Sequence, residues 1–291
     1  MARNANQTSN YDYPVVQEKL FTGDGKETEW FVNRRTDTDQ NLGICTEQYG
    51  LFQNADVFGA ADDAIAARGL VPTDRNVYVS DNGARARYVL DFKDHTIQLP
   101  QVGDTLGMRL IVNNSFDRSL RLSFMLGLLR LVCTNGMKAL DQEFCLTKRH
   151  SKKTSIDDLI TDNALDSALD SFSKTGDTFA RLANTAIEQE QGLNILQNLA
   201  KGNVLSEKVR EGIAGVWNAP TYEEDSDRNL YNLYNATTQH LTRDVASERF
   251  EYSERVSTNV LKKLAVASQN ETKLAKLVKA LPIAETDLAK N

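Results

Sequence analysis

The segment Arg118–Thr154, RSLRLSFMLGLLRLVCTNGMKALDQEFCLTKRHSKKT, decides the fold of this chain. Its first part alternates between two sets of residues: Leu120, Leu122, Phe124 and Leu126 in one set, and Ser119, Arg121, Ser123 and Met125 in the other. A two-residue period of this kind predicts a strand with one buried face and one solvated face.

The rest of the segment changes character three times. Residues 128–133 are almost all apolar, which predicts that the chain enters a core here. Residues 134–136, Thr-Asn-Gly, have turn or cap chemistry, and residues 137–140 restart at a helical spacing. A short apolar piece at 143–146 then leads into the basic cluster 148–153.

Composition places the chain among ordinary globular proteins. Its 291 residues are 41% hydrophobic and 25% charged, which is enough to bury a substantial core. The formal net charge of −6 argues against a protein covered in positive charge. It still permits a local basic face, because phosphate contacts depend on the charges nearby and not on the total.

The cysteines and the N-terminal residues predict the cellular compartment of the protein. Cys45, Cys133 and Cys145 are an odd number of cysteines in apolar, strand-like settings, as expected for reduced and buried thiols in a cytosolic protein. The opening MARNANQTSNYDYP lacks the apolar region of a signal peptide, and no apolar run approaches a membrane span. We therefore expect a cytoplasmic protein with no membrane partner.

The order of patterns predicts an α+β protein. We expect a flexible tail at 1–13, an α+β core domain at 14–154 with a mainly antiparallel sheet and packed helices, and a helical region at 155–291. The predicted strands are 13–16, 29–32, 42–46, 76–80, 84–92, 96–99 and 105–113, and a first helix runs from an N-cap at Asn54 to Gly69. The predicted later helices are 155–170, 177–201, 204–218, 228–246 and 256–281, with an acidic connector at 219–227.

No pattern for catalysis, cofactor binding or metal binding is present. The phosphate-binding, dinucleotide, nucleophile-elbow and zinc-protease motifs are all missing, and the three histidines, His95, His150 and His240, look like surface residues. Cys133, Cys145 and His150 lack zinc-site spacing, and the aspartates at 157–170 are typical of a solvated helix face. We predict a protein that is not an enzyme and uses no cofactor or metal.

A binding function has better support. Arg85 and Arg87 alternate with apolar residues, so both should project from one face of the sheet, and Arg109 and Arg121 can join them. The basic loop that follows supplies Lys148, Arg149, Lys152 and Lys153. Such a face suits the phosphates of a single strand, although arginines on wet sheet faces also serve solubility alone.

Two further groups of residues are ambiguous. Tyr78, Tyr88 and Phe92 are candidates to stack on bases, but Tyr88 and Phe92 share the apolar parity and are expected in the core. Residues 229–241, NLYNLYNATTQHL, combine amides and tyrosines with an apolar stripe. Such a segment predicts a helix docked by hydrogen bonds, with a partner surface as the alternative.

The motifs YGLFQNADVFGAADDAI, RLVCTNGMKAL, TKRHS and NLYNLYNATTQHL resemble the phage/plasmid-like protein family of unknown function, over about residues 42 to 245. The matching positions are Tyr49, Gln53, Asn54, Phe58 and Arg130 through Gly136. The resemblance implies a bacteriophage or mobile-element origin and no settled activity.

The order of elements is also similar to single-strand annealing recombination proteins, which hold single strands in a basic groove and form rings or filaments. Thr134, Gly136, Lys138, Ala139 and Leu140 stand where the helix of that core would begin. The chain departs from them in its lower density of aromatics and lysines and in its acidic total.

Two functions remain open at this point. The first is a phage-encoded, homo-oligomeric single-stranded DNA-binding and annealing protein of recombination or replication, working in the host cytoplasm. The second is a phage protein that inhibits or redirects a host protein through its acidic helices, for example by mimicking nucleic acid. A continuous basic groove favours the first, and a continuous acidic face favours the second.

Overall fold

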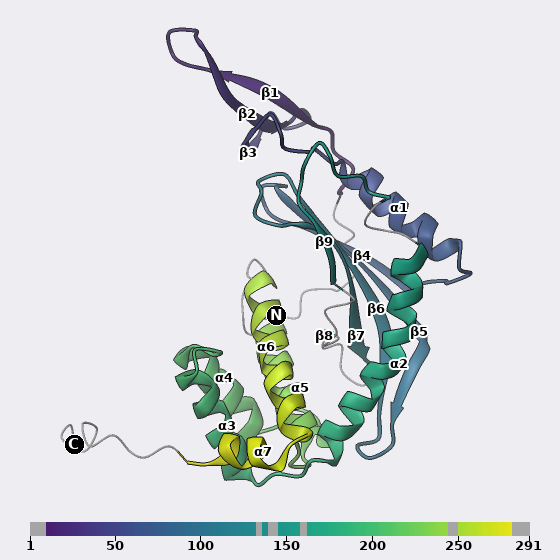
Figure 1. Ribbon diagram of the computed structural model, residues 1–291, viewed down its shortest axis with the longest axis vertical. Coiled ribbons are helices and arrows are strands. Elements are labelled where there is room, and N and C mark those ends of the chain that lie inside the picture. Colours follow the sequence, from purple (N-terminus) through teal and green to yellow (C-terminus); the bar gives the residue numbers. More distant parts are fainter. Residues whose placement is uncertain (1–9, 132–135, 139–144, 158–161, 244–249, 281–291) are drawn as a thin grey trace, which may run out of the picture. The chain divides into compact units, whose positions relative to one another are not determined.

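The structure, a computed structural model, describes residues 10–131, 136–138, 145–157, 162–243 and 250–280, and confirms the α+β class (Figure 1). Two compact units divide the chain. The first contains residues 1–96, 107–127 and 141–172, and the second contains 97–106, 128–140 and 173–291. The units interleave along the sequence because three long strands and one long helix each pass from one unit into the other.

A small antiparallel sheet in the first unit has the order β1-β2-β3. Its strands are β1 (Val15–Phe21), β2 (Glu27–Arg35) and β3 (Asn41–Thr46), which extend the predicted strands in this region. On its inner face the fully buried Asn33 donates from Nδ2 to the carbonyl oxygen of Phe116, at 2.7 Å. Gly43 permits the close approach of the sheet to the segment around Phe116. A Cβ at this position would lie 2.6 Å from the Cα of Asp117, which is a steric clash.

A larger sheet has the order β4-β5-β6-β7-β8, and β9 also pairs with β7. The strands are β4 (Asp74–Val79), β5 (Arg85–Leu99), β6 (Asp104–Ser115), β7 (Leu122–Arg130), β8 (Gly136–Lys138) and β9 (Cys145–Lys148). The predicted break between residues 92 and 96 is wrong. The exposed polar residues there, His95 among them, continue β5 because pairing with its neighbouring strands satisfies the backbone.

Helix α1 (Asn54–Ala66) covers one face of the larger sheet in the first unit (Figure 1). Its stripe of Val57, Phe58, Ala61 and Ile65 is buried, and the Phe58 ring lies 5.1 Å from that of Tyr88. The predicted N-cap is wrong by one residue: Gln53 occupies the N-cap, and Asn54 bonds to Asn114 instead. Gly69 follows the helix at a φ of +66°, a conformation that favours glycine.

Strand β7 differs from its prediction because both of its faces are covered. Ser123 and Met125, which the alternation placed in solvent, are 5% and 8% exposed. Met125 packs with Val89 and Ile111, so the second face has an apolar cluster of its own. The two-residue alternation of the sequence shows which residues share a face of the strand, but it does not show whether that face is exposed to solvent.

The helix predicted from Met137 is also wrong in its described part. Residues 136–138 form β8, because this segment adds to the edge of β7 and obtains backbone hydrogen bonds there. Residues 132–135 and 139–144 lie outside the described residues, and with them Cys133 and the remaining positions of the annealing-protein resemblance.

The helical region contains α2 (Asp162–Asn184), α3 (Gln189–Lys201), α4 (Glu207–Asn218), α5 (Leu230–Arg243), α6 (Phe250–Ser268) and α7 (Glu271–Val278), with a 3₁₀ turn, η2 (Glu223–Asp225), before α5. The predicted helix 177–201 is divided at residues 185–188, where Glu188 and Gln191 form a capping box that starts α3. Among the described residues, no helix is long and apolar enough to cross a membrane.

Candidate nucleic-acid interface

The two faces of the larger sheet have different roles in the first unit. On β5, Ala86 and Tyr88 point toward α1 and are buried. Arg85 and Arg87 therefore project from the opposite face. We call this opposite face, which carries Arg85, Arg87, Arg109 and Arg121, the arginine face.

Hydrogen bonds tie the strands together in a polar row across the arginine face. Tyr78 on β4 lies opposite Arg87, whose Nε donates to Asn113 Oδ1 at 2.9 Å. Asn113 Nδ2 donates to Ser123 Oγ at 2.9 Å, and Ser123 lies opposite Thr147 on β9. The row thus crosses β4, β5, β6, β7 and β9, and Arg87 lies within it between Tyr78 and Asn113.

Arg109 sits on the same face in a buried ion pair. Its Nη2 donates to Asp91 Oδ2 at 2.8 Å, and its Nε donates to the other carboxylate oxygen. The two side chains are 18% and 6% exposed. Arg109 therefore neutralises a buried carboxylate, and removing it would leave that charge unpaired.

The arginines nearest the ends of the strands are open to solvent. The last residue pair of the β7–β9 ladder is Leu122 with Lys148, and Arg121 and Arg149 are the next residues outward from the two strands. Both are exposed, and neither forms an ion pair with any described residue. Two positive charges on neighbouring segments repel each other, and a bound anion would relieve this repulsion.

The basic loop continues from this pair. Lys148, Arg149, Lys152 and Lys153 are all exposed, and Lys152 alone has an acidic partner among the described residues, Glu47, at 3.4 Å. The loop backbone is fixed by Lys152, whose N–H donates to the carbonyl oxygen of Gln48 at 3.1 Å. It also lies against Gly50, where a Cβ would be 2.4 Å from the carbonyl oxygen of Ser151.

His150 anchors this loop from inside. Its ring stacks on Tyr49 with centroids 5.2 Å apart and planes 6° apart, and it also contacts Phe52. Burial lowers the pKa of His150 to about 4, so the ring is neutral at pH 7. The prediction of a surface histidine is wrong, because the ring packs against Tyr49 and Phe52.

The hydrogen bonds assign the proton on His150. Its Nε2 lies 2.9 Å from Asn114 Oδ1. The amide of Asn114 already donates to Asn54 Oδ1 at 2.8 Å and to the carbonyl oxygen of Phe52. Asn114 Oδ1 must therefore accept, and His150 donates from Nε2. Anchored residues from α1, β6 and the loop thus hold the cations in place.

Sequence reasoning missed this anchor, although a signal for it was present. Tyr49 and Asn54 belong to the motif that carries the family resemblance, and His150 belongs to TKRHS. The Tyr49 hydroxyl donates to the carbonyl oxygen of Ser115 at 2.6 Å, and burial raises its pKa. Gln53, the remaining polar motif residue, bonds to the backbone of Val15 through both ends of its amide.

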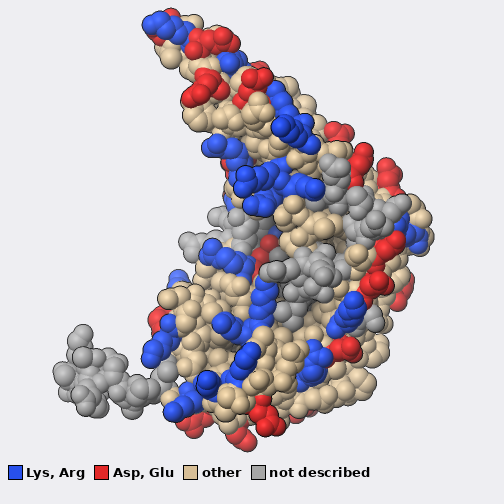
Figure 2. Space-filling model, viewed as in Figure 1, with Lys and Arg blue, Asp and Glu red and all other residues tan. Residues whose placement is uncertain are grey.

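Figure 2 shows Lys and Arg gathered on the first unit close to the base of the three-stranded sheet. Of the predicted binding residues, Arg121, Lys148, Arg149, Lys152 and Lys153 are exposed. Lys148 pairs with the buried Leu122, so it projects from the sheet face opposite to the arginine face. Arg85, Arg87 and Arg109 lie on the arginine face but are partly covered and bonded within the protein.

The remaining candidate residues have structural surroundings. Tyr88 and Phe92 are in the core as predicted, whereas Tyr78 is 55% exposed. Cys45 is buried as predicted, but Cys145 is exposed, because its side chain projects from β9 at the side of the sheet. Within the described ranges, no group of three or more acidic, His or Cys side chains could hold a metal ion.

A second polar cluster is buried in the second unit. Arg130 is 1% exposed; it pairs with Asp104 through Nε and with Asp225 through Nη1, at 2.9 Å in the latter case. From α5, Tyr231 donates to Asp104 at 2.7 Å and Asn235 donates to Asp225 at 3.0 Å. The predicted docked helix is confirmed, and Asp225 is buried although the sequence placed it in an exposed acidic connector.

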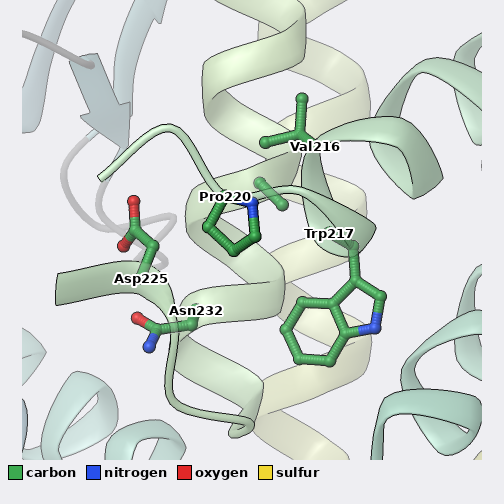
Figure 3. Close-up of a pocket in the computed structure, with 6 residues that line it drawn as sticks. Val216, Trp217, Pro220, Asp225 and Asn232 are labelled. Atoms are coloured by element: carbon green, nitrogen blue, oxygen red, sulfur yellow. The ribbon is translucent and has the colours of Figure 1, made fainter. Parts of the chain in front are cut away.

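A small recess adjoins this cluster (Figure 3). Asp225 and Asn232 lie on one side of it and the Trp217 ring on the other, with Pro220 between them. The recess has room for about one water molecule and is therefore too small for an organic ligand. The polar groups here are already engaged with Arg130 and α5, so we assign the cluster to stability.

Comparisons with known proteins locate the chain in a family. No curated protein and no solved structure matches it. The family described as a domain of unknown function, DUF932, matches residues 41–280. That range contains both the anchor of the basic loop and the buried Arg130 cluster. The chain therefore belongs to the DUF932 family.

Proposed function

We propose that this protein binds single-stranded DNA, without catalysing a reaction, through Arg121, Lys148, Arg149, Lys152 and Lys153. The observation that carries the proposal is that Arg121 and Arg149, the residues just beyond the last pair of the β7–β9 ladder, are both exposed and have no acidic partner among the described residues. A phosphate between two such guanidinium groups relieves their repulsion and gains charge-assisted hydrogen bonds.

The way the loop is held supports the same proposal. Binding through flexible lysines and arginines loses affinity to the ordering of side chains and backbone. Here the backbone on both sides of Arg149 is fixed already, by the β7–β9 ladder and by the stacked His150. Lys152 remains shared with Glu47, so it contributes less than its neighbours.

The partly buried arginines have a supporting role in this proposal. Arg87 and Arg109 bond to Asn113 and Asp91, which fixes the strands that present the outer cations. Their positive charge still adds to the local potential, although each would have to give up a partner to contact a phosphate directly.

The proposal extends to the biological setting. We infer a bacteriophage protein that acts in the cytoplasm of the host, self-associates and promotes annealing during recombination or replication. The sequence resemblances support these parts, and two measurements test them. Light scattering of the purified protein reports self-association, and a fluorescence assay with complementary oligonucleotides reports annealing.

The direct test is anisotropy of a fluorescent single-stranded oligonucleotide across a salt series. Each phosphate contact on a single strand adds about 0.7 to the slope of log affinity against log salt. Arg121→Ala combined with Arg149→Ala should therefore lower the slope by about 1.4 and weaken binding at low salt. Lys273→Ala with Lys276→Ala on α7 removes the same charge from exposed positions elsewhere and should leave the slope unchanged.

The outcomes test single-strand binding and its assignment to Arg121 and Arg149 separately. Wild-type protein that fails to bind at low salt would end the proposed function. Binding that both double variants weaken equally would keep the function and remove the site, because total charge and not position would then decide affinity.

A host protein as partner remains the second proposal, and one observation favours it. Trp30 and Ile44 project from one face of the three-stranded sheet, 40% and 52% exposed, and Phe21 near its hairpin is 60% exposed. Apolar groups gathered on a small sheet suit a protein surface better than a phosphate backbone. If a variant that no longer binds the oligonucleotide keeps the protein's effect in the host cell, the host-protein proposal is favoured over the DNA-binding proposal.

A further inference from the structure

We propose that Tyr78 is a stacking platform for one unpaired nucleobase, and that it makes the arginine face selective for single strands over duplex. This inference rests on the proposed function and adds a subsite to it. The ligand of the subsite is the flat face of a base, whereas the ligands of Arg121 and Arg149 are phosphates.

The position of Tyr78 carries the inference. It lies on β4, the edge strand of the larger sheet, and its side chain is 55% exposed. The register places it opposite Arg87, so it projects from the arginine face, while its neighbour Val77 points to the core and is 2% exposed. An aromatic ring that is half exposed at the edge of the sheet gives up apolar burial, and a stacked base would restore it.

The surroundings of Tyr78 match a nucleic-acid strand. Its hydroxyl forms no hydrogen bond with any described residue, so the ring has no anchoring role within the protein. Arg87 is directly across from it, and Arg85 lies two residues further along β5 on the same face. A base on Tyr78 would therefore have its own phosphates beside these two arginines.

The dimensions allow one strand to reach both subsites. Tyr78 on β4 and Arg149 after β9 are separated by four strand spacings, roughly 19 Å at about 4.8 Å each. Known single-strand sites cover about 4–16 nucleotides per module, which is ample for this span. The path follows the outer ends of the strands, where Arg121 and Arg149 are exposed and Arg85 is partly covered, and avoids the buried apolar cluster of Val89, Ile111 and Met125.

Stacking and phosphate contacts leave different experimental signatures. Loss of one stacked base weakens binding by about 5- to 150-fold and leaves the salt slope unchanged, because no counterion is released at the ring. In a duplex the base faces are covered by their neighbours, so Tyr78 can contribute to single-strand binding only.

The test uses the full chain with a fluorescent single strand and the matching duplex, each across a salt series. Tyr78→Ala should weaken single-strand binding about 5- to 150-fold at an unchanged slope and leave duplex binding as it was. Tyr78→Phe keeps the ring and should bind like wild type. Trp30→Ala, an exposed aromatic on the other sheet, is the matched control and should have no effect.

Each result has a defined meaning. Wild-type binding that Tyr78→Ala leaves unchanged overturns the stacking subsite and leaves the phosphate site standing. An equal loss on single strand and duplex overturns selectivity. Loss in Tyr78→Phe as well as in Tyr78→Ala overturns stacking in favour of the hydroxyl. A wild-type protein that binds neither oligonucleotide removes the proposed function itself.

Discussion

Replacing Arg130 with methionine should destabilise the second unit more than any change to a surface ion pair. Arg130 lies between two carboxylates, Asp104 and Asp225, which are 2% and 7% exposed. Methionine fills a similar volume but cannot donate a hydrogen bond. The substitution therefore leaves two buried negative charges without their shared counterion.

The expected loss follows from the cost of an unpaired buried charge. Removing one partner of a buried ion pair typically costs about 3–5 kcal/mol. Tyr231 and Asn235 continue to donate to the two carboxylates, so we expect the lower half of this range, about 3–4 kcal/mol. For comparison, Arg210→Met removes an exposed pair with Glu207 on α4 and should cost under about 1 kcal/mol.

Urea unfolding read by Trp217 fluorescence measures this loss within the second unit. The chain has two tryptophans, so Trp30→Phe leaves Trp217 as the reporter. Trp217 is 1% exposed and belongs to the same unit as Arg130. All variants are compared in that background, and unchanged slopes of free energy against urea would validate the comparison.

A loss under about 1 kcal/mol for Arg130→Met would refute the reasoning, because the carboxylates would then be stable without the guanidinium. A triple variant gives the matching rescue. Adding Asp104→Asn and Asp225→Asn to Arg130→Met removes all three charges and keeps acceptors for Tyr231 and Asn235. It should recover more than half of the loss, and failure to recover would show that packing and not charge dominates.

Two further predictions concern the anchor of the basic loop. Because burial lowers the pKa of His150 from 6.5 to about 4, the unfolded chain binds more protons between these values, and stability should fall by up to about 3 kcal/mol as pH falls through that window. His150→Phe should remove this pH dependence in thermal melts, and an unchanged dependence would contradict the assignment. Gly50→Ala should displace Ser151 and weaken oligonucleotide binding. The control is Gly59→Ala on α1, where the space at the Cβ is open, and this variant should bind the oligonucleotide like wild type and melt at no lower temperature. Equal behaviour of the two alanine variants would show that the loop does not depend on Gly50.

Local patterns in the sequence predicted most of the elements, and their failures have physical causes. The α+β order and the helix that begins near Asn54 depend on periodicity and cap chemistry, which neighbouring residues determine. The strand β8 was predicted as a helix because its spacing alone allows both. Pairing with β7 decides between them, and that contact is not visible in the local sequence.

The candidate site was predictable in part for the same reason. Parity on β5 placed Arg85 and Arg87 on one face correctly, because alternation along a strand is a local property. The partners of these side chains were not predictable, since Asn113 and Asp91 reach the arginines across strands. The sequence therefore identifies a basic face without showing which cations are already engaged.

The motifs that carry the family resemblance help to explain how scaffold and function are divided in this chain. Tyr49 and Asn54 build the anchor under the basic loop, and Arg130 joins β7 to α5 through buried carboxylates. These motif residues are bonded inside the protein, whereas Arg121, outside the motifs, and Lys148, within TKRHS, are exposed to solvent. Motif residues of this kind fix where a loop sits, and exposed residues decide what it binds. Substitutions at Arg121 or Lys148 should therefore change affinity for an anion while leaving the fold intact, because no buried group loses a partner.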